Sequence, residues 1–171
     1  AVANIGESVI TKEDLKSCYA KYGFGKATGF SLKREDKGNI DYKYQIEAAT
    51  AGYGQGITTT PMQHIQALTA IANDGVMLRP YVVDKITLSN SKKSIYTGKR
   101  MVVGTVASSD TISKMKELMK SVITGDETNS TGYAYYMDGY DLIGKTGTAQ
   151  IYDYTKGSYM KGSSDYIYSF S

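Results

Sequence analysis

The sequence is poor in residues that form covalent or metal cross-links. Its 171 residues include a single cysteine, Cys18, a single histidine, His64, and no tryptophan. One cysteine cannot form an internal disulfide, and a lone histidine without a second Cys or His nearby argues against a zinc site. Cys18 lies at helical spacing beside Leu15, Tyr19 and Tyr22, so we interpret it as a small buried hydrophobic residue and not as a nucleophile.

Long apolar runs and a strong charge are missing as well. No stretch resembles a signal peptide or a membrane span. The 20 Lys and Arg residues against 17 Asp and Glu give a formal charge of +3, and because the basic residues are scattered, nucleic acid is not an expected partner. Hydrophobic residues make up 41% and charged residues 22%, which is typical of a soluble globular domain.

Three segments have the periodicity of amphipathic helices. The first follows Thr11-Lys12-Glu13-Asp14, which has the pattern of an N-terminal capping box, and ends at Gly23. The second begins at Thr60-Pro61-Met62-Gln63, where a capping residue precedes a proline, and should end with Gly75 at the C′ position. The third has an apolar face and should end near Gly125; the residues of that face are Ile112, Met115, Leu118, Met119 and Val122.

Other segments have the composition of strands. Residues 81–88 and 94–96 read as two short strands, and 140–152 and 165–170 as two longer ones. The longer pair, joined by a connector with two glycines, most simply forms an antiparallel hairpin. Residues 24–47 read as loop, and residues 48–59, with three glycines within five residues, as a backbone that bends or is approached closely. The expected fold class is therefore α+β, with helices packed on an antiparallel sheet.

The segment Gly144–Gln150 carries the most chemical information. Lys145 provides a positive charge near an anionic ligand, and Thr146 and Thr148 alternate along the strand so that both hydroxyls point to one face. Gly147 between them lets a ligand lie close to the backbone. A backbone N–H left unpaired by the sheet can then stabilise an oxyanion. A strand with Lys-Thr-Gly is one of three active-site elements in β-lactamases and penicillin-binding proteins.

Further segments, in the same order along the chain, make the chain resemble the class B, monofunctional penicillin-binding proteins, most of all the division-associated transpeptidases of Gram-positive bacteria. The fold that this resemblance implies is the penicillin-binding transpeptidase fold, which serine β-lactamases share. The segments that carry it are Tyr22-Gly23-Phe24-Gly25 with Thr28-Gly29, Gly52-Tyr53-Gly54-Gln55-Gly56-Ile57, Thr60-Pro61-Met62-Gln63, Ala70-Ile71-Ala72-Asn73-Asp74-Gly75-Val76-Met77-Leu78-Arg79-Pro80 and Asp165-Tyr166-Ile167-Tyr168-Ser169-Phe170.

The resemblance implies a peptidoglycan D,D-transpeptidase, in which a serine is acylated by a stem peptide and β-lactams trap that serine. Lys145 would then place the substrate carboxylate and sustain the proton network, and Thr146 and Thr148 would bind that carboxylate. The Thr148 N–H would form half of the oxyanion hole, and Gly147 and Gln150 would line the groove. The resemblance implies no metal and no organic cofactor.

Two motifs of the family are missing. No serine that begins a helix is followed three residues later by lysine. Ser113 and Ser158 have that spacing but lie inside the third helix and in the connector between the last two strands. The Ser-x-Asn motif is also absent. Both motifs precede the matched part in the family, so we expect residues 1–171 to be the C-terminal portion of one transpeptidase domain, inactive alone, whose nucleophile-bearing N-terminal portion is absent.

Two alternatives to a transpeptidase remain open at this point. One is a β-lactamase or β-lactam sensor domain, and the other is a non-catalytic binding module with the same fold. For a transpeptidase, the expected partners are stem peptides, β-lactams, the absent N-terminal portion and, for a division-type member, cell-division proteins. The expected location is the extracytoplasmic face of the bacterial membrane, with an anchor outside this chain.

Overall fold

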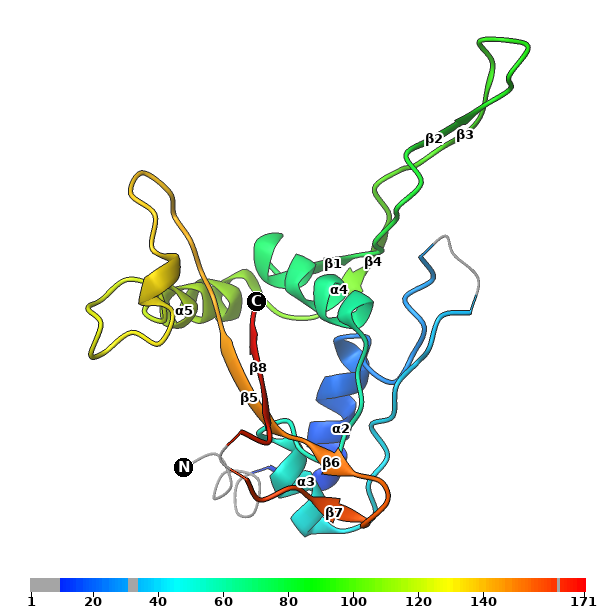
Figure 1. Cartoon of the computed structure of the whole chain (residues 1–171). Coiled ribbons are helices and arrows are strands. Elements are labelled where there is room, and N and C mark those ends of the chain that lie inside the picture. The colour runs from blue at the N-terminus through cyan, green and yellow to red at the C-terminus, as the bar shows by residue number, and fades with distance from the viewer. Residues whose placement is uncertain (1–9, 31–33, 163) are drawn as a thin grey trace. The chain divides into compact units, whose positions relative to one another are not determined.

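The computed structural model describes residues 10–30, 34–162 and 164–171, which form helices and two-stranded antiparallel sheets in two compact units, 1–109 and 110–171 (Figure 1). The predicted α+β class is confirmed. The helical elements are α2 (Lys12–Lys21), α3 (Gln45–Ala51), α4 (Pro61–Ala72), α5 (Ser109–Lys120) and the 3₁₀ turn η1 (Tyr133–Tyr135). The strands are β1 (Val76–Leu78), β2 (Lys85–Thr87), β3 (Ser94–Thr97), β4 (Val102–Thr105), β5 (Thr146–Gln150), β6 (Tyr152–Asp153), β7 (Ser158–Tyr159) and β8 (Tyr166–Phe170).

The first helix, α2, begins where the sequence predicts. The Thr11 hydroxyl accepts a hydrogen bond from the Asp14 N–H at 3.1 Å, and the Asp14 carboxylate accepts one from the Thr11 N–H at 3.4 Å. Cys18, however, is exposed, so its predicted burial is wrong. The covered side of α2 is the one with Tyr19, whose hydroxyl donates to the Ala51 carbonyl at 2.5 Å, and no residue of α2 is fully buried.

The short helix α3 lies where the sequence predicts a loop and then a backbone that bends. Its first turn is closed by the Glu47 carboxylate, which accepts hydrogen bonds from the N–H groups of Lys43 (2.6 Å) and Tyr44 (2.9 Å). Three of its seven residues are buried alanines, Ala48, Ala49 and Ala51. A helix this short is held by packing more than by propensity, which explains why its periodicity is invisible in the sequence.

The longer helix α4 confirms its predicted capping box. The Thr60 hydroxyl accepts from the Gln63 N–H at 3.2 Å, and the Gln63 side chain accepts from the Thr60 N–H at 2.9 Å. Gln63 is completely buried, and its amide nitrogen donates to the carbonyls of Lys26 and Lys37, each at 2.8 Å. One buried amide therefore pairs with three backbone groups and ties the preceding loop to the start of α4.

The end of α4 differs by one residue from the prediction. Asn73 caps the helix, Asp74 (φ 49°) occupies the left-handed C′ position, and Gly75 (φ 93°) follows it. The Gly75 N–H donates to the Ala70 carbonyl at 2.8 Å, which is the six-residue hydrogen bond of a Schellman motif. A Cβ atom on Gly75 would collide with the Ala107 carbonyl, so this glycine also permits the chain to return close by.

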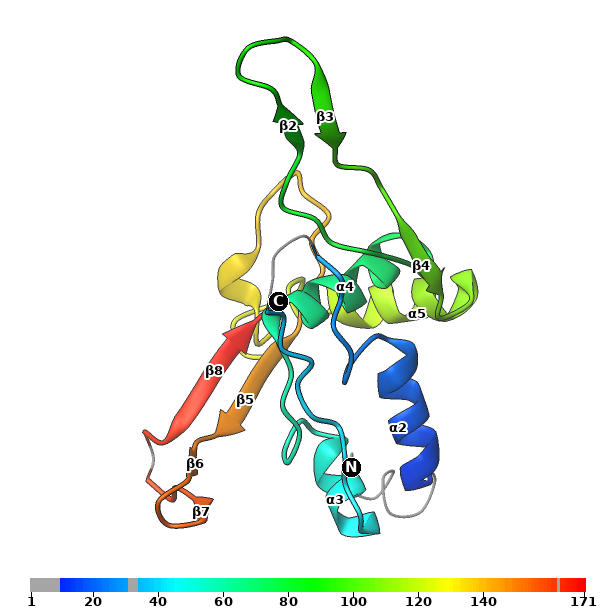
Figure 2. The ribbon, with the colours of Figure 1, turned by 90° about the vertical axis from the view of Figure 1, so that its right-hand side faces the viewer.

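The strands of unit 1 form two ribbons. The first pairs β1 with β4, an element pair that the sequence analysis missed, and it buries Met77 with Ala70 and Val106 against Tyr22. The second pairs β2 with β3 as a hairpin, as predicted, although the first strand covers only Lys85–Thr87. Figure 2 shows this hairpin extending away from α4.

Unit 2 contains α5 and the strands that follow it. Ile112 and Met119 of α5 are buried, together with Ile123 beyond its end, whereas Met115 and Leu118 of the predicted apolar face are exposed, so that face is confirmed only in part. β5 pairs with β8 in an antiparallel ribbon, as predicted, with Thr146 opposite Phe170 and Gln150 opposite Tyr166. The first strand begins at Thr146 and not at residue 140, and its connector folds into the small β6–β7 hairpin. No helix in the described ranges is long and apolar enough to span a membrane.

Candidate functional site

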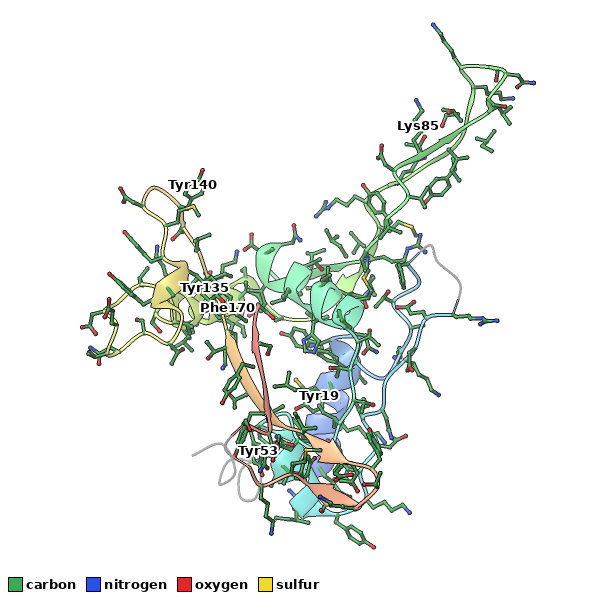
Figure 3. All side chains as sticks on the ribbon, viewed as in Figure 1. Tyr19, Tyr53, Lys85, Tyr135, Tyr140 and Phe170 are labelled. Carbon is green, nitrogen blue, oxygen red and sulfur yellow. The ribbon has the colours of Figure 1, made fainter. Side chains whose placement is uncertain are left out.

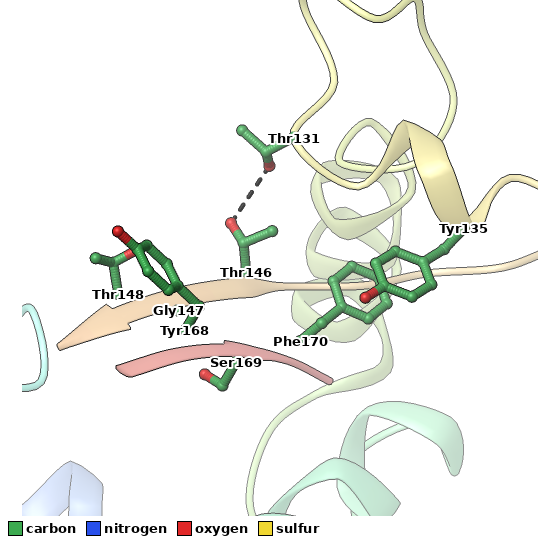
Figure 4. A pocket seen from close by; sticks show the side chains of 8 residues that line it. All are labelled: Thr131, Tyr135, Thr146, Gly147, Thr148, Tyr168, Ser169 and Phe170. Carbon is green, nitrogen blue, oxygen red and sulfur yellow. Dashed lines mark hydrogen bonds between the residues drawn. The ribbon is translucent and has the colours of Figure 1, made fainter. Parts of the chain in front are cut away.

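The predicted site residues lie on the β5–β8 ribbon. Side chains alternate across a strand, so Thr146, Thr148 and Gln150 share one face, and their cross-strand partners Phe170, Tyr168 and Tyr166 share it with them. In Figure 4, Thr146 and Thr148 rise from the same side of the ribbon as Tyr168, whereas Ser169 points from the other side. The predicted pairing of the two threonine hydroxyls on one face is thus present.

The backbone of β5 is hydrogen bonded on one edge only. Lys145 and Ser171 exchange two backbone hydrogen bonds, at 2.9 and 3.1 Å, and the Ile151 N–H donates to the Asp165 carbonyl at 3.0 Å. In an antiparallel ladder such pairs alternate with pairs whose backbone groups point outward. The Thr148 N–H therefore points away from β8, toward an edge that no strand of the described ranges covers.

Lys145 precedes β5 by one residue and is exposed. Its Nζ donates to the Thr146 carbonyl at 2.6 Å. Since Thr146 and Thr148 both direct their backbone groups to the open edge, this contact brings the ammonium group to the edge where the Thr148 N–H is free. A cation and a free N–H on one strand edge are suited to hold an anion.

A cavity of about 400 Å³ lies over the hydroxyl-bearing face. Its lining residues are Thr131, Tyr135, Thr146, Gly147, Thr148, Tyr168, Ser169 and Phe170. The hydroxyls of Thr131 and Thr146 lie 3.3 Å apart, as the dashed line in Figure 4 marks. Three of the predicted site residues thus line one cavity, whereas Lys145 and Gln150 are outside its lining.

One wall of the cavity is aromatic. The rings of Tyr135 and Phe170 stack with their centroids 4.0 Å apart and their planes 12° apart. Gly132 and Gly144 make room for this stack, because a Cβ atom on Gly132 would lie 2.9 Å from Phe170 Cε2 and one on Gly144 2.5 Å from Phe170 Cζ. Figure 3 shows Tyr135 and Phe170 side by side in the whole chain.

Sequence reasoning missed Thr131 and Tyr135. Both lie between α5 and β5, Thr131 in the turn-rich segment 125–132 and Tyr135 in the short turn η1 after it, where no periodic signal exists. Gly147 faces the opposite side of the ribbon from the threonine hydroxyls. There it leaves room for the Ser169 side chain, a close approach that was not predicted. A Cβ atom at Gly147 would lie 2.5 Å from the Ser169 hydroxyl.

The serines with a lysine three residues later do not begin helices. Ser113 lies inside α5 and is exposed, and Ser158 begins the two-residue strand β7. Ser89, with Lys92, has the same spacing and was missed by the sequence analysis, but it lies in the β2–β3 turn. The ranges described contain no group of three or more His, Cys, Asp or Glu side chains that would suit a metal ion.

Known proteins are similar to this chain over most of its length. Residues 2–170 match the family described as the penicillin binding protein transpeptidase domain. The chain is 32% identical over 146 residues to stage V sporulation protein D of Bacillus subtilis, which covers 81% of this chain and 21% of that protein. It is also 32% identical to penicillin-binding protein 2B of Streptococcus pneumoniae, over 82% of this chain and 22% of that protein. The chain thus spans about a fifth of the length of these relatives.

Solved structures show the same fold. Penicillin binding protein 2X from Streptococcus thermophilus superimposes with a TM-score of 0.84 at 24% identity, covering 99% of this chain and 27% of that one. Penicillin-binding protein 2B from Streptococcus pneumoniae superimposes with a TM-score of 0.71 at 30% identity, over 82% of this chain and 24% of that one. This chain belongs to the penicillin binding protein transpeptidase domain family.

Proposed function

We propose that these 171 residues are the C-terminal part of a peptidoglycan D,D-transpeptidase and that they supply one wall of its active site. The single observation that carries the proposal is the open edge of β5. There the Lys145 ammonium group and the outward Thr148 N–H lie beside a face that bears the Thr146 and Thr148 hydroxyls. The Thr131 hydroxyl, 3.3 Å from that of Thr146, adds a further polar group to this face.

The reaction is an acyl transfer in two steps. A serine hydroxyl attacks the carbonyl carbon of the penultimate D-alanine of a stem peptide, its proton passes to the leaving amine, and the terminal D-alanine is released. An amine of a neighbouring stem peptide then attacks the ester, and the serine regains a proton. The serine belongs to a portion of the protein outside this chain. β-Lactams would acylate the same serine because their ring amide replaces the scissile bond.

Each proposed role follows from a position on the ribbon. The Thr148 N–H, directed to the open edge, would bind the oxyanion of each tetrahedral intermediate. The hydroxyls of Thr146 and Thr148, together with the Lys145 charge, would hold the substrate carboxylate. Gln150 lies on the same face two residues beyond Thr148, where it would contact the more distant part of the stem peptide.

The location and partners follow from the substrate. Peptidoglycan is cross-linked outside the cytoplasmic membrane, so the catalytic domain would act on the extracytoplasmic side, with a membrane anchor elsewhere in the protein. Because the sequence resembles the division-associated transpeptidases, we include proteins of the division machinery among the proposed partners.

Fluorescent penicillin tests this function on the complete protein. A transpeptidase should form a covalent adduct that survives denaturing electrophoresis and is blocked by an excess of unlabelled penicillin. Rapid turnover of the reagent would indicate a β-lactamase instead, and the absence of both labelling and turnover would indicate a binding module without chemistry.

A further inference from the structure

The hairpin of unit 1 concentrates positive charge. Residues 79–100, which we call the basic hairpin, contain β2, β3 and their flanks. The single acidic residue among them is Asp84. The basic residues are Arg79, Lys85, Lys92, Lys93, Lys99 and Arg100. The whole chain has an excess of only three positive charges, so this one segment has a larger excess than the whole.

These charges are not neutralised within the described ranges. None of the six basic side chains forms a salt bridge with an acidic residue there. Figure 3 shows Lys85 on the hairpin well away from α4. Surface cations usually pair with nearby acids or are interspersed with them. A run of unpaired cations on a projecting element is instead suited to attract an acidic partner.

The basic hairpin also exposes apolar side chains. No residue in the range 81–97 is buried. Exposed fractions reach 56% for Val82 and 58% for Ile95, and four further apolar side chains are exposed, Tyr81, Ile86, Leu88 and Tyr96. A two-stranded hairpin is marginally stable in water without a third strand or a packing surface. The basic hairpin therefore has apolar surface that an added strand could cover, and the added strand would stabilise the hairpin.

The backbone of β2 presents an open edge. The Leu88 N–H donates to the Lys93 carbonyl at 3.2 Å, and the Gly98 N–H donates to the Asp84 carbonyl at 2.6 Å. Even-numbered residues of β2 thus face β3, and the backbone groups of Lys85 and Thr87 point outward. No strand of the described chain pairs with this edge.

The charges and side chains of the basic hairpin favour one kind of binding partner at the β2 edge over others. A second copy of the chain would bring six more positive charges to the same edge, which like-charge repulsion disfavours. Insertion into a lipid surface would need apolar residues at the tip, but the tip is Ser89-Asn90-Ser91-Lys92-Lys93. An extended protein segment with acidic and apolar residues in alternation would match both the charges and the strand edge.

We propose that the β2 edge of the basic hairpin binds an extended acidic segment of a partner protein, which adds to the hairpin as a third strand. The outward N–H and carbonyl groups of Lys85 and Thr87 hydrogen bond to the partner backbone. Lysines of the hairpin pair with its carboxylates, and the exposed apolar residues cover its apolar side chains. This docking surface is independent of the transpeptidase reaction.

Binding is measured with a fluorescent synthetic peptide in which Glu and Val alternate, against a control peptide in which Lys and Val alternate. The complete protein should bind the acidic peptide, more weakly as salt rises, and should not bind the basic one. The variant Lys85→Glu/Lys93→Glu should weaken binding at least about tenfold, equivalent to ~1.4 kcal/mol. The matched control Lys26→Glu/Lys114→Glu reverses two exposed lysines elsewhere and should change affinity less than about twofold. Failure to bind the acidic peptide, or equal effects of both variants, would overturn the proposal.

Amide hydrogen exchange distinguishes strand addition from simple charge attraction. Bound peptide should slow exchange at the Lys85 and Thr87 amides, which point outward in the free hairpin. Unchanged exchange at both amides would overturn the strand-addition geometry. Slow exchange of these amides in the free protein would mean that another part of the protein covers the β2 edge. Binding to phosphatidylglycerol vesicles without binding to the acidic peptide would mean that the hairpin binds a membrane. Either result would also overturn the proposal.

Discussion

The proposed roles of Thr148 involve two separate parts of one residue. Its side chain shares a face with Thr146, and its N–H points to the open edge of β5. Both features follow from the antiparallel register and need no special backbone conformation. Lys145 adds a charge to that edge through its contact with the Thr146 carbonyl. The donors are held on a strand, so little reorganisation is needed when an anion binds.

Replacement of Lys145 tests the charge at this edge. In the complete protein, Lys145→Ala should slow acylation by fluorescent penicillin by ~10²–10³, because it removes electrostatic stabilisation aimed at the reacting centre. The rate is measured from a quenched time course. Lys161→Ala, which removes an exposed lysine from the β7–β8 connection, is the matched control and should leave the rate unchanged. An unchanged rate in Lys145→Ala would remove this residue from the site.

At the scale of elements, the turn after α4 depends on a backbone conformation and a close approach. Gly75 has φ 93°, and its absent side chain leaves room for the Ala107 carbonyl. Gly54 has a similar φ of 87° but nothing within 4 Å of the position of a Cβ atom. Alanine at Gly54 would incur only the cost of a left-handed conformation. Alanine at Gly75 would incur that cost and the cost of a collision with Ala107.

Alanine at these two positions should have unequal effects. Gly54→Ala should lower the free energy of unfolding by ~1–2 kcal/mol, the cost of a left-handed conformation. Gly75→Ala should lower it by about 1–3 kcal/mol more, because backbone atoms must shift. Urea denaturation measures both values. Equal losses would show that the approach of Ala107 places no constraint on Gly75.

One carboxylate holds the turn at residues 126–129, in the segment between α5 and β5. Asp126 accepts hydrogen bonds from the N–H groups of Thr128 (2.9 Å) and Asn129 (3.0 Å) and from their side chains. These bonds, foremost the one from the Thr128 hydroxyl, hold the pKa of Asp126 below its usual value. The turn that they form leads directly to Thr131 at the cavity.

The depressed pKa of Asp126 predicts a pH dependence with a definite sign. A carboxyl group whose pKa is lower in the folded state stabilises the fold above its unfolded pKa of ~3.9, and that contribution is lost as the pH falls through the folded pKa. The difference in unfolding free energy between the parent and Asp126→Ala should therefore be constant above about pH 5 and shrink below about pH 4. Urea titrations across this range measure it, with Glu127→Ala as the control. A difference that stays constant to the lowest pH would contradict the proposed role of the carboxylate.

At the scale of the whole molecule, the proposed function gives this chain one wall of the site, and its sequence has no helix-starting serine followed three residues later by lysine. The 171-residue chain incubated with benzylpenicillin should therefore show no covalent adduct in its intact mass spectrum. The complete protein under the same conditions is the positive control. An adduct on the isolated chain, mapped by peptide digestion to Ser89, Ser113 or Ser158, would show that the nucleophile lies within these residues.

Sequence reasoning succeeded where the cause was local. The capping boxes at Thr11 and Thr60 depend on residues three positions apart, and both were predicted. It failed where partners are distant. The pairing of β1 with β4, the helix α3 and the exposure of Cys18 depend on what packs against them, which no short window of sequence contains.

The sequence alone determined that Thr146 and Thr148 share a face, because alternation is a property of any strand. Tertiary structure decided which edge of β5 remains open, since that depends on β8 pairing in a particular register. It also decided that Thr131 and the Tyr135–Phe170 stack line the cavity over that face. The physical reason is the distance along the chain over which each effect acts. Backbone dihedral preferences depend on neighbouring residues, whereas strand pairing and packing depend on residues far apart in the sequence.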